Sequence, residues 1–321
     1  MAEETVPSAR VPISDERTFR SYTIQQGANY AEARRDYHPS LYETIKKHHL
    51  STGGRLGSLL DVGCGPGRAT RSLATHFDHA VGIDPSEGMI ATALALENTG
   101  SRLGPIRFAV SSAEALGCDL DPPVPEASVD LVTAATAAHW FNMPAFWERA
   151  ALAVKPGGTV ALWSPGPITI ISPTPNPTAI QAAVDDFEAS LDPFMVDGNR
   201  LVRKLYIDLP LPWTLAEPVE AFDEKSFVRK EWGTETASEA SGTFMAIQSP
   251  VDMMMVEKIF STSSPVTRWR EAHPDRVGTE QDIVRITRRR IEHLLHQSGV
   301  EEGQEKLYAD MSAVLMMIKR N

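Results

Sequence analysis

The stretch LLDVGCGPGRATRSL, residues 59–73, decides the fold. An apolar run ends at Asp61, three glycines follow at alternate positions (Gly63, Gly65 and Gly67), and a helix-like pattern then begins. A glycine turn between a strand and a helix lets a ligand approach the main chain where any Cβ would block it. The pattern therefore predicts a βα unit whose turn either holds a ligand or is a plain glycine-rich connection.

The residue at the start of the helix-like pattern discriminates between two classes of ligand. The dinucleotide-binding pattern GxGxxG needs a glycine at its sixth position for close helix packing, and here Arg68 occupies that position. S-adenosyl-L-methionine suits the turn better, because Asp61 and exposed backbone N–H groups can meet its ammonium and its carboxylate. We therefore expect this cofactor, and a nicotinamide oxidoreductase ranks last, since no second nucleotide-binding half is visible either.

Composition and charge exclude several classes of protein. The chain has 321 residues, 42% of them hydrophobic, and a formal charge of −11, which predicts a globular protein with one large core or a core and a smaller lobe. No apolar run approaches the roughly 20 residues that span a bilayer, and the N-terminus lacks a signal-peptide pattern. We expect a cytoplasmic protein that binds neither membranes nor nucleic acid, while its oligomeric state stays open.

Two local patterns that could indicate other functions have simpler explanations. Cys64 and Cys118 show no metal-ligand spacing, so we expect neither a disulfide framework nor a metal site. The basic run RITRRR, residues 285–290, lies in a helical pattern whose apolar members are expected to face inward. A solvated helix face is the preferred interpretation of this run. The inward-facing set comprises Ile283, Ile286, Ile291, Leu294 and Leu295.

The order of apolar and helical patterns divides the chain into four parts. We expect a tail and helical lid at 1–54, an α/β cofactor-binding core at 55–164, an insertion at 165–274 that covers the cleft, and a helix and strand at 275–321 that complete the core. The predicted strands are 58–63, 79–84, 105–110, 128–141, 159–164 and 307–320, with 225–234 as a further candidate. The predicted helices are 67–77, 85–98, 144–158 (ending at its glycines), a segment from Pro177 capped by Asn176, 249–260 and 280–298.

Polar and small residues follow the predicted strands, at the edge where doubly wound sheets bind ligands. Asp84 ends the second strand, where a carboxylate can accept both hydroxyls of a ribose; its alternative role is a helix cap. Glu114, or the backbone near it, can meet an adenine edge, although a helix cap explains that segment nearly as well. The small residues of AATAAHW, 134–140, leave room for a ligand and equally suit close packing.

These segments, in this order and spacing, resemble a class I S-adenosylmethionine-dependent methyltransferase. LLDVGCGPGRAT resembles the glycine-rich motif, GIDPSEGMI the ribose-binding segment, DLVTAATAAHWF the fourth-strand motif, and VKPGG the turn before the fifth strand. The resemblance implies a Rossmann-like, doubly wound, seven-stranded and mostly parallel sheet. It also implies a cofactor-binding set of Asp61, Gly63, Gly65, Gly67, Asp84, Met89, Ser112, Ala113, Glu114 and Ala135.

A narrower likeness extends outside these motifs. ARRDYHPSLYETI, AHWFNMPAFWERAALAVKPGGTVALW, FVRKEW and RWREAHPD are similar to the trans-aconitate methyltransferase-like group, which is mainly fungal. The likeness implies O-methylation of a small carboxylate such as trans-aconitate or a related metabolite, in a pocket lined by Arg34, Tyr37, His139 and Trp140. The segment STSSPV, 261–266, departs from the group's pattern, so the acceptor pocket is expected to differ there.

The chemistry of methyl transfer gives roles to two of these residues. A carboxylate acceptor, with a pKa near about 4, is already ionised, so Arg34 would only have to orient it. A phenol, thiol or amine acceptor would call for a base, and His139 is then the candidate. The alternatives are a salt bridge for Arg34 and a buried, backbone-satisfied histidine for His139. Tyr22, Tyr30, Tyr37 and Trp140 either contact the substrate and the sulfonium or pack in the core.

Two further functions remain open from the sequence. One is a cyclase that keeps the cofactor fold without transferring the methyl group. The other is a protein that binds the cofactor without catalysis, although every cofactor-facing motif is intact in this chain.

Overall fold

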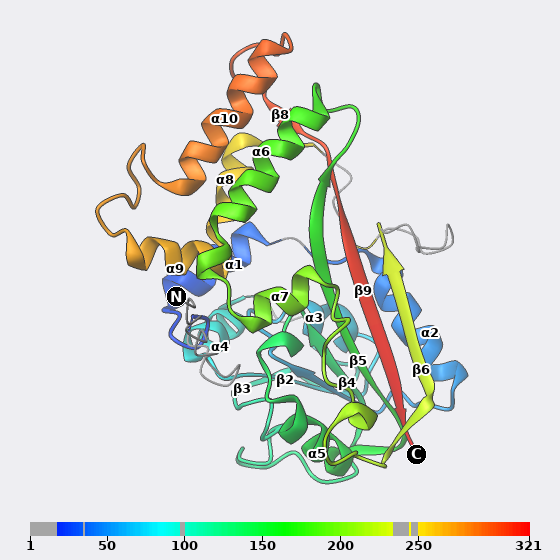
Figure 1. Ribbon diagram of the computed structural model, residues 1–321. Coiled ribbons are helices and arrows are strands. Elements are labelled where there is room, and N and C mark those ends of the chain that lie inside the picture. The colour runs from blue at the N-terminus through cyan, green and yellow to red at the C-terminus, as the bar shows by residue number, and fades with distance from the viewer. Residues whose placement is uncertain (1–17, 35, 97–99, 234–243, 245–249) are drawn as a thin grey trace, which may run out of the picture.

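The computed structural model describes residues 18–34, 36–96, 100–233, 244 and 250–321 (Figure 1). Of the predicted tail and lid at 1–54, residues 1–17 and residue 35 lie outside the described residues. The helices, in chain order, are α1 (Ile24–Ala33), α2 (Pro39–Ser51), α3 (Arg68–Ala74), α4 (Glu87–Ala95), α5 (Met143–Ala153), α6 (Pro177–Ser190), α7 (Asp197–Arg203), α8 (Met253–Ser261), α9 (Ser264–Ala272) and α10 (Ile283–Gln297), with short 3-10 turns η2 (Ala138–Trp140), η3 (Asp192–Phe194) and η4 (Pro212–Thr214).

A seven-stranded sheet forms the centre of the molecule, in the order β3-β2-β1-β4-β5-β9-β6. The first five strands of that order run parallel, and β9 runs antiparallel to both β5 and β6. The predicted doubly wound, seven-stranded and mostly parallel sheet is therefore confirmed. The strands are β1 (Ser58–Val62), β2 (His79–Asp84), β3 (Arg107–Val110), β4 (Val129–Ala135), β5 (Val154–Ile170), β6 (Phe222–Trp232) and β9 (Ala309–Arg320), with a separate pair of β7 (Val251–Asp252) and β8 (Lys306–Leu307).

Two hydrophobic cores cover the two faces of the sheet. On one face, α2, α3 and α4 bury apolar side chains against β1, β4, β5 and β9, and Ala69, Leu73, Ala74 and Phe77 belong to this core. On the other face, α5 and residues 201–222 pack on the same strands, with Phe146 and Trp147 fully buried. Strands that are covered on both faces read as continuous apolar runs, which is why the sequence revealed them.

Helix α5 and strand β5 differ from their predicted bounds. The helix ends at Ala153, because Val154 already has extended dihedrals (φ −74°, ψ 137°) and pairs with Val129 of β4. The glycines at 157 and 158 therefore lie in the strand and do not end the helix. Strand β5 continues past the predicted end at Ser164 to Ile170, because β9 pairs with it as far as Ile170.

Four helices, α6, α8, α9 and α10, form a cap above the carboxyl ends of the parallel strands (Figure 1). The apolar stripe on α6 (Ile180, Val184, Phe187 and Leu191) is buried in this cap. Pro177 begins α6 as predicted, but Asn176 adopts left-handed dihedrals and its side chain forms no capping bond. Asp252 caps α8 by accepting a hydrogen bond from the Met255 N–H.

The cap and the sheet share the chain differently from the predicted division. Helix α10, expected to complete the core, packs on α6 and α8, because its buried Ile291 and Leu295 join the apolar cluster of those helices. Conversely, β6 lies within the 165–274 range but pairs with β9 at the edge of the sheet. The insertion is therefore a cap together with one sheet strand.

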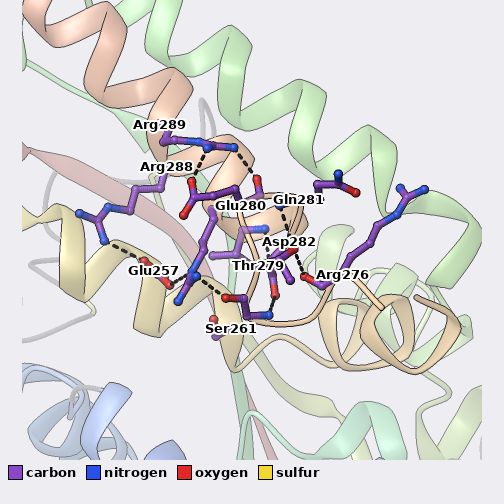
Figure 2. Close-up of polar contacts among 12 residues, drawn as sticks. Glu257, Ser261, Arg276, Thr279, Glu280, Gln281, Asp282, Arg288 and Arg289 are labelled. Atoms are coloured by element: carbon purple, nitrogen blue, oxygen red, sulfur yellow. Dashed lines mark hydrogen bonds and ion pairs between the residues drawn. The ribbon is translucent and has the colours of Figure 1, made fainter. Parts of the chain in front are cut away.

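The basic run 285–290 lies on the outer face of α10 among carboxylates (Figure 2). Arg285 and Arg288 both pair with Glu257 of α8, at 3.2 and 2.8 Å, and Arg289 pairs with Glu280. These ion pairs fit a solvated helix face, as expected. The prediction for Ile286 is wrong, since it is 48% exposed; the helix twist places Val284 and Thr287 on the buried side instead.

Among the residues that the structure describes, no helix has the length and apolar character needed to cross a membrane.

Candidate functional site

A cavity of about 390 Å³ lies where the glycine turn, the lid helix α1 and the cap meet. The turn and Asp84 contribute to its lining, and so do side chains of α6, α7, α8 and α9. The predicted site residues that line it are Tyr30, Arg34, Tyr37, Gly63, Gly65, Asp84, Met89, Ala113, Glu114, Ala135, His139 and Trp140. Most of the predicted cofactor set and acceptor set therefore share one space, as a two-substrate site requires.

The glycine turn has three left-handed residues with different roles. Gly63, Gly65 and Gly67 have φ values of +64°, +53° and +81°, a region that side chains rarely adopt. A Cβ on Gly65 would meet no protein atom within 4 Å, so its backbone faces open space in the cavity. A Cβ on Gly67 would lie 2.6 Å from the Phe108 ring, so this glycine serves packing and does not line the cavity.

Asp84 connects the two loops that follow β1 and β2. Its Oδ2 accepts the Gly65 N–H at 2.9 Å, and its Oδ1 accepts the Ser86 N–H at 2.9 Å. Burial raises the pKa of Asp84 to about 6, against the opposing effect of these two N–H groups. The alternative role of Asp84 as a helix cap is not observed, because Ser86 caps α4. Its Oγ accepts the Met89 N–H at the start of that helix. Each Asp84 oxygen keeps a lone pair for a further donor, and the residue lines the cavity.

Asp61 lies behind the turn and does not line the cavity, contrary to the expectation that it meets the ligand's ammonium. The side chain is fully buried, and its oxygens accept hydrogen bonds from Thr70 Oγ1 at 2.5 Å and Thr133 Oγ1 at 2.7 Å. Burial also raises its pKa to about 6. Asp61 thus ties β1 to α3 and β4 beneath the turn, and direct contact with a ligand is not supported.

Residues after β3 and β4 line the part of the cavity next to Asp84. Glu114 accepts the Asn142 N–H at 2.9 Å through Oε1, which anchors the start of α5 to this wall. Ser112 does not line the cavity; its Oγ accepts the Ala115 N–H at 3.2 Å and so caps a turn. The small side chains of Ala113 and Ala135 leave the space between these polar groups open.

These features fit S-adenosylmethionine. The cradle at Gly65 admits a ligand next to the main chain, and the Asp84 carboxylate can accept ribose hydroxyls. When bound, the cofactor supplies an electrophilic methyl group, so the chain has only to bind it, orient the acceptor and exclude water.

Arg34 stands at the C-terminal end of α1 and lines the cavity. Its guanidinium lies 5.3 Å from the centroid of the Tyr30 ring, and its buried Nε has no hydrogen-bond partner. No carboxylate pairs with Arg34 among the described residues, so the salt-bridge alternative finds no support there. A planar cation in this state is suited to bind a carboxylate in two-point fashion.

Aromatic side chains surround Arg34. Phe19, which the sequence analysis missed, packs on Tyr30 at 5.9 Å and on Trp140 at 5.7 Å between ring centroids. Contrary to the prediction, Tyr22 does not line this cavity. Its ring packs on Phe19, with 5.1 Å between the ring centroids. The Tyr37 hydroxyl is bonded to Thr136 Oγ1 at 2.6 Å, and burial raises the pKa of Tyr37.

His139 is buried and faces the cavity from η2. Its Nδ1 lies 2.7 Å from the hydroxyl of Tyr206, and desolvation lowers the pKa of His139 to about 3. The imidazole is therefore neutral at neutral pH and a weak base. Tyr206 was not predicted, since it lies far along the chain, after α7, with left-handed dihedrals (φ +60°) that no local pattern indicated.

Arg68, which argued against a dinucleotide, ties the lid to the turn. Its Nη2 donates to the Ala31 carbonyl of α1, and its side chain lines the cavity. The lid helix is thereby fixed to the first helix of the core.

Comparisons with known proteins agree with this geometry. A family model described as a methyltransferase domain matches residues 60–162. A Dictyostelium discoideum protein named as a methyltransferase is 29% identical over 56% of this chain and 62% of its own length. CRG1 of Saccharomyces cerevisiae, named as an S-adenosylmethionine-dependent methyltransferase, is 36% identical over 43% of this chain and 45% of its own length.

A solved structure extends the likeness in fold to most of the chain. It is described as a type II methyltransferase of Anaeromyxobacter dehalogenans, and it covers 89% of this chain and 97% of its own with a TM-score of 0.59 at 22% identity. The sequence matches cover about half of the curated relatives, whereas the fold continues through the cap. Residues 60–162 therefore form a methyltransferase domain, and the glycine turn and Asp84 of that domain fit S-adenosylmethionine as its cofactor.

Proposed function

We propose that the protein methylates a carboxylate oxygen of a small organic acid. The observation that carries the proposal is the state of Arg34. This arginine lines the cavity, its Nε lacks a partner, and it pairs with no carboxylate among the described residues. An acceptor carboxylate held by this guanidinium would stand in the same cavity as the glycine turn and Asp84. Trans-aconitate and related metabolites, implied by the resemblance in sequence, are the first acceptors to test.

The residues of the cavity match the demands of ester formation. The acceptor oxygen attacks the methyl carbon, an O–C bond forms as the S–C bond breaks, and sulfur takes the electron pair. No proton moves in this step, because a carboxylic acid with a pKa near about 4 is ionised at neutral pH. Alignment of the two reactants at about 3 Å, with water excluded, supplies roughly 7–11 kcal/mol of catalysis.

The neutral state of His139 argues against the alternative acceptors. A phenol, thiol or amine would need a base with a pKa near the working pH. The pKa of His139 is lowered to about 3 by burial, so its conjugate acid is too strong for that role. The histidine is better suited to forming the cavity wall beside Trp140, whose ring centroid lies 4.5 Å away.

The test combines labelled cofactor with variants of Arg34. Wild-type protein is incubated with methyl-labelled S-adenosylmethionine and a panel of acids, phenols, thiols and amines, and products are read by mass for one added methyl group. Arg34→Gln should lower kcat/KM for an acid about 10²–10⁴-fold, since two charge-assisted hydrogen bonds contribute about 1.5–3 kcal/mol each. Arg34→Lys should recover part of the loss, and affinity for S-adenosylhomocysteine should not change.

A matched control is Arg102→Gln, which removes an exposed arginine paired with Asp78 at 3.3 Å, outside the cavity lining. It should leave turnover unchanged. Methylation of phenols or amines in place of acids, or full acid turnover by Arg34→Gln, would refute the proposal. A product that forms without gaining label would indicate a cyclase, and cofactor binding without any product a non-catalytic protein.

A further inference from the structure

Part of the cavity lining comes from the cap helices and from β5. We call this part the cap chamber. Its apolar wall comes from β5, α6 and α8 and consists of Ile168, Val184, Phe187, Leu191, Ile259 and Phe260. Phe187 and Phe260 stack at 4.9 Å with an interplanar angle of 13°, which gives the chamber a flat aromatic face.

The polar groups of this chamber are paired with one another. Glu188 faces Arg203 at 3.6 Å, and Arg203 also pairs with Asp192 at 2.7 Å. Asn199 donates from Nδ2 to Ser264 Oγ at 2.9 Å, which joins α7 to the start of α9. The charged side chains of the chamber therefore compensate each other, and they leave no net cation for a ligand.

Arg34 carries the cationic charge that is available to an acceptor. Arg68 also lines the cavity and its Nε likewise lacks a partner, but it follows the glycine turn directly and donates to the Ala31 carbonyl, so we assign its charge to the cofactor side. Arg20 is exposed, and its charge acts on Asp84 at the cofactor end, where it opposes the raised pKa of that carboxyl. One carboxylate can thus be neutralised on the acceptor side, whereas further carboxylates of a polyacid would lie against apolar walls or against Glu188.

We propose that the acceptor is an organic acid with one carboxylate and an apolar, aromatic or branched aliphatic body. The carboxylate binds Arg34 beside the aromatic side chains of the lid, and the apolar body fills the cap chamber against Phe187 and Phe260. The inference rests on the proposed carboxylate methylation and, within it, favours apolar monoacids over polyacids such as trans-aconitate. The departure of the segment 261–266 from the group's pattern lies in this wall, since Ser263, Ser264 and Pro265 line the cavity.

The test compares acids that share a carboxylate and differ in their bodies. Cinnamate, 4-phenylbutyrate and a branched C8 acid are set against trans-aconitate and citrate, with wild-type protein and labelled cofactor. We expect kcat/KM to be at least about tenfold higher for the apolar monoacids, the discrimination that a few buried methylene groups provide.

Three variants of α8 make the test specific to the chamber. Ile259→Glu places a carboxylate in the chamber and should lower kcat/KM for the apolar acids by more than about tenfold. Met254→Glu adds the same charge to the same helix, but at a residue that is 62% exposed and does not line this cavity, and should act as wild type. Ile259→Ala, which shortens the side chain without adding charge, should give a smaller loss. The affinity of each variant for S-adenosylhomocysteine, measured by calorimetry, verifies that it is folded.

The possible outcomes distinguish failure of this inference from failure of the proposed function. Preference for trans-aconitate or citrate would overturn the apolar monoacid and leave carboxylate methylation standing. Equal turnover of apolar acids by wild type and a folded Ile259→Glu variant would place their bodies elsewhere and likewise overturn the inference. Cofactor binding without methylation of any acid would overturn the proposed function, and the inference with it.

Discussion

Removal of the Asp84 carboxylate should abolish most of the affinity for the cofactor while leaving the fold largely intact. Asp84 already accepts the N–H groups of Gly65 and Ser86, and each of its oxygens keeps a lone pair for a ribose hydroxyl. A hydrogen bond to a charged group contributes about 1.5–3 kcal/mol. Loss of two such bonds in Asp84→Ala therefore costs about 3–6 kcal/mol, or a factor of about 10²–10⁴ in Kd.

The stability of the same variant should change little, for two opposing reasons. Burial raises the pKa of Asp84 from 3.8 to about 6, so the ionised carboxylate lowers the free energy of unfolding by about 3 kcal/mol at neutral pH. Below pH 3.8 this cost is absent, since both states are protonated, and it grows as the pH rises toward 6. Alanine removes the cost but leaves two N–H groups without an acceptor, at about 1–3 kcal/mol each.

Calorimetric titration with S-adenosylhomocysteine and thermal unfolding of the same sample measure both quantities. Glu87→Ala is the matched control, because it removes an exposed carboxylate from the first turn of α4, three residues away. It should bind as wild type does. An Asp84→Ala protein that is folded and binds within about threefold of wild type would show that the ribose does not lie against this carboxylate.

Four further perturbations test other parts of the site. Affinity of wild type for S-adenosylhomocysteine should weaken as the pH falls below about 6, because the raised pKa of Asp84 protonates the acceptor of the ribose bonds, and calorimetry at several pH values in Asp84→Asn should show no such dependence from this group. Gly65→Ala should bind the cofactor more than about tenfold more weakly with an unfolding cost near about 1 kcal/mol, since its Cβ meets no protein atom but enters the cavity at positive φ; tight binding by calorimetry would contradict this. Tyr206→Phe should lower the free energy of unfolding in urea by about 1–3 kcal/mol, because His139 Nδ1 loses its buried partner, and an unchanged midpoint would refute the importance of that bond. Turnover of an acid at saturating substrates should show no inflection near the usual histidine pKa of about 6.5, and an inflection that disappears in His139→Gln would assign that residue as a base after all.

The elements that the sequence predicted correctly are those whose evidence is local. The positions Ala69, Leu73, Ala74 and Phe77 repeat with the helical period beside a buried strand, and all four are buried in the structure. The glycine turn and Asp84 were also found, because a backbone that needs positive φ and a carboxylate at a strand end leave marks within a few residues.

The predictions are wrong where a segment far away in the sequence determines the local structure. Glycines such as those at 157 and 158 commonly end a helix. Here, however, the chain is extended from Val154 onward, because it pairs with β4 from Val154 and with β9 from Thr159. The amphipathic pattern of α10 does not specify the partner of its apolar face, and in the structure that face packs on α6 and α8. Sequence spacing equally could not show that Asp61 faces two threonines beneath the turn.

The candidate site shows the same division. His139 was selected as a cavity residue, but its protonation depends on burial and on Tyr206, which only the folded chain brings within 2.7 Å. Arg34 was selected by resemblance, and its lack of a described carboxylate partner is a property of the folded structure. The residue types of the site could therefore be predicted from the sequence, whereas the protonation state of His139 and the pairing of Arg34 could not.

Strands β5 and β9 leave the parallel sheet as one two-stranded ribbon that runs up beside α6 (Figure 1). Because Pro165 and Ala313 pair across this ribbon, helices from a relative could be exchanged beyond them without altering the glycine turn or Asp84. Evolution can proceed in the same modular way: replacement of the cap helices would change the acceptor, while the sheet with its glycine turn and Asp84 would be retained.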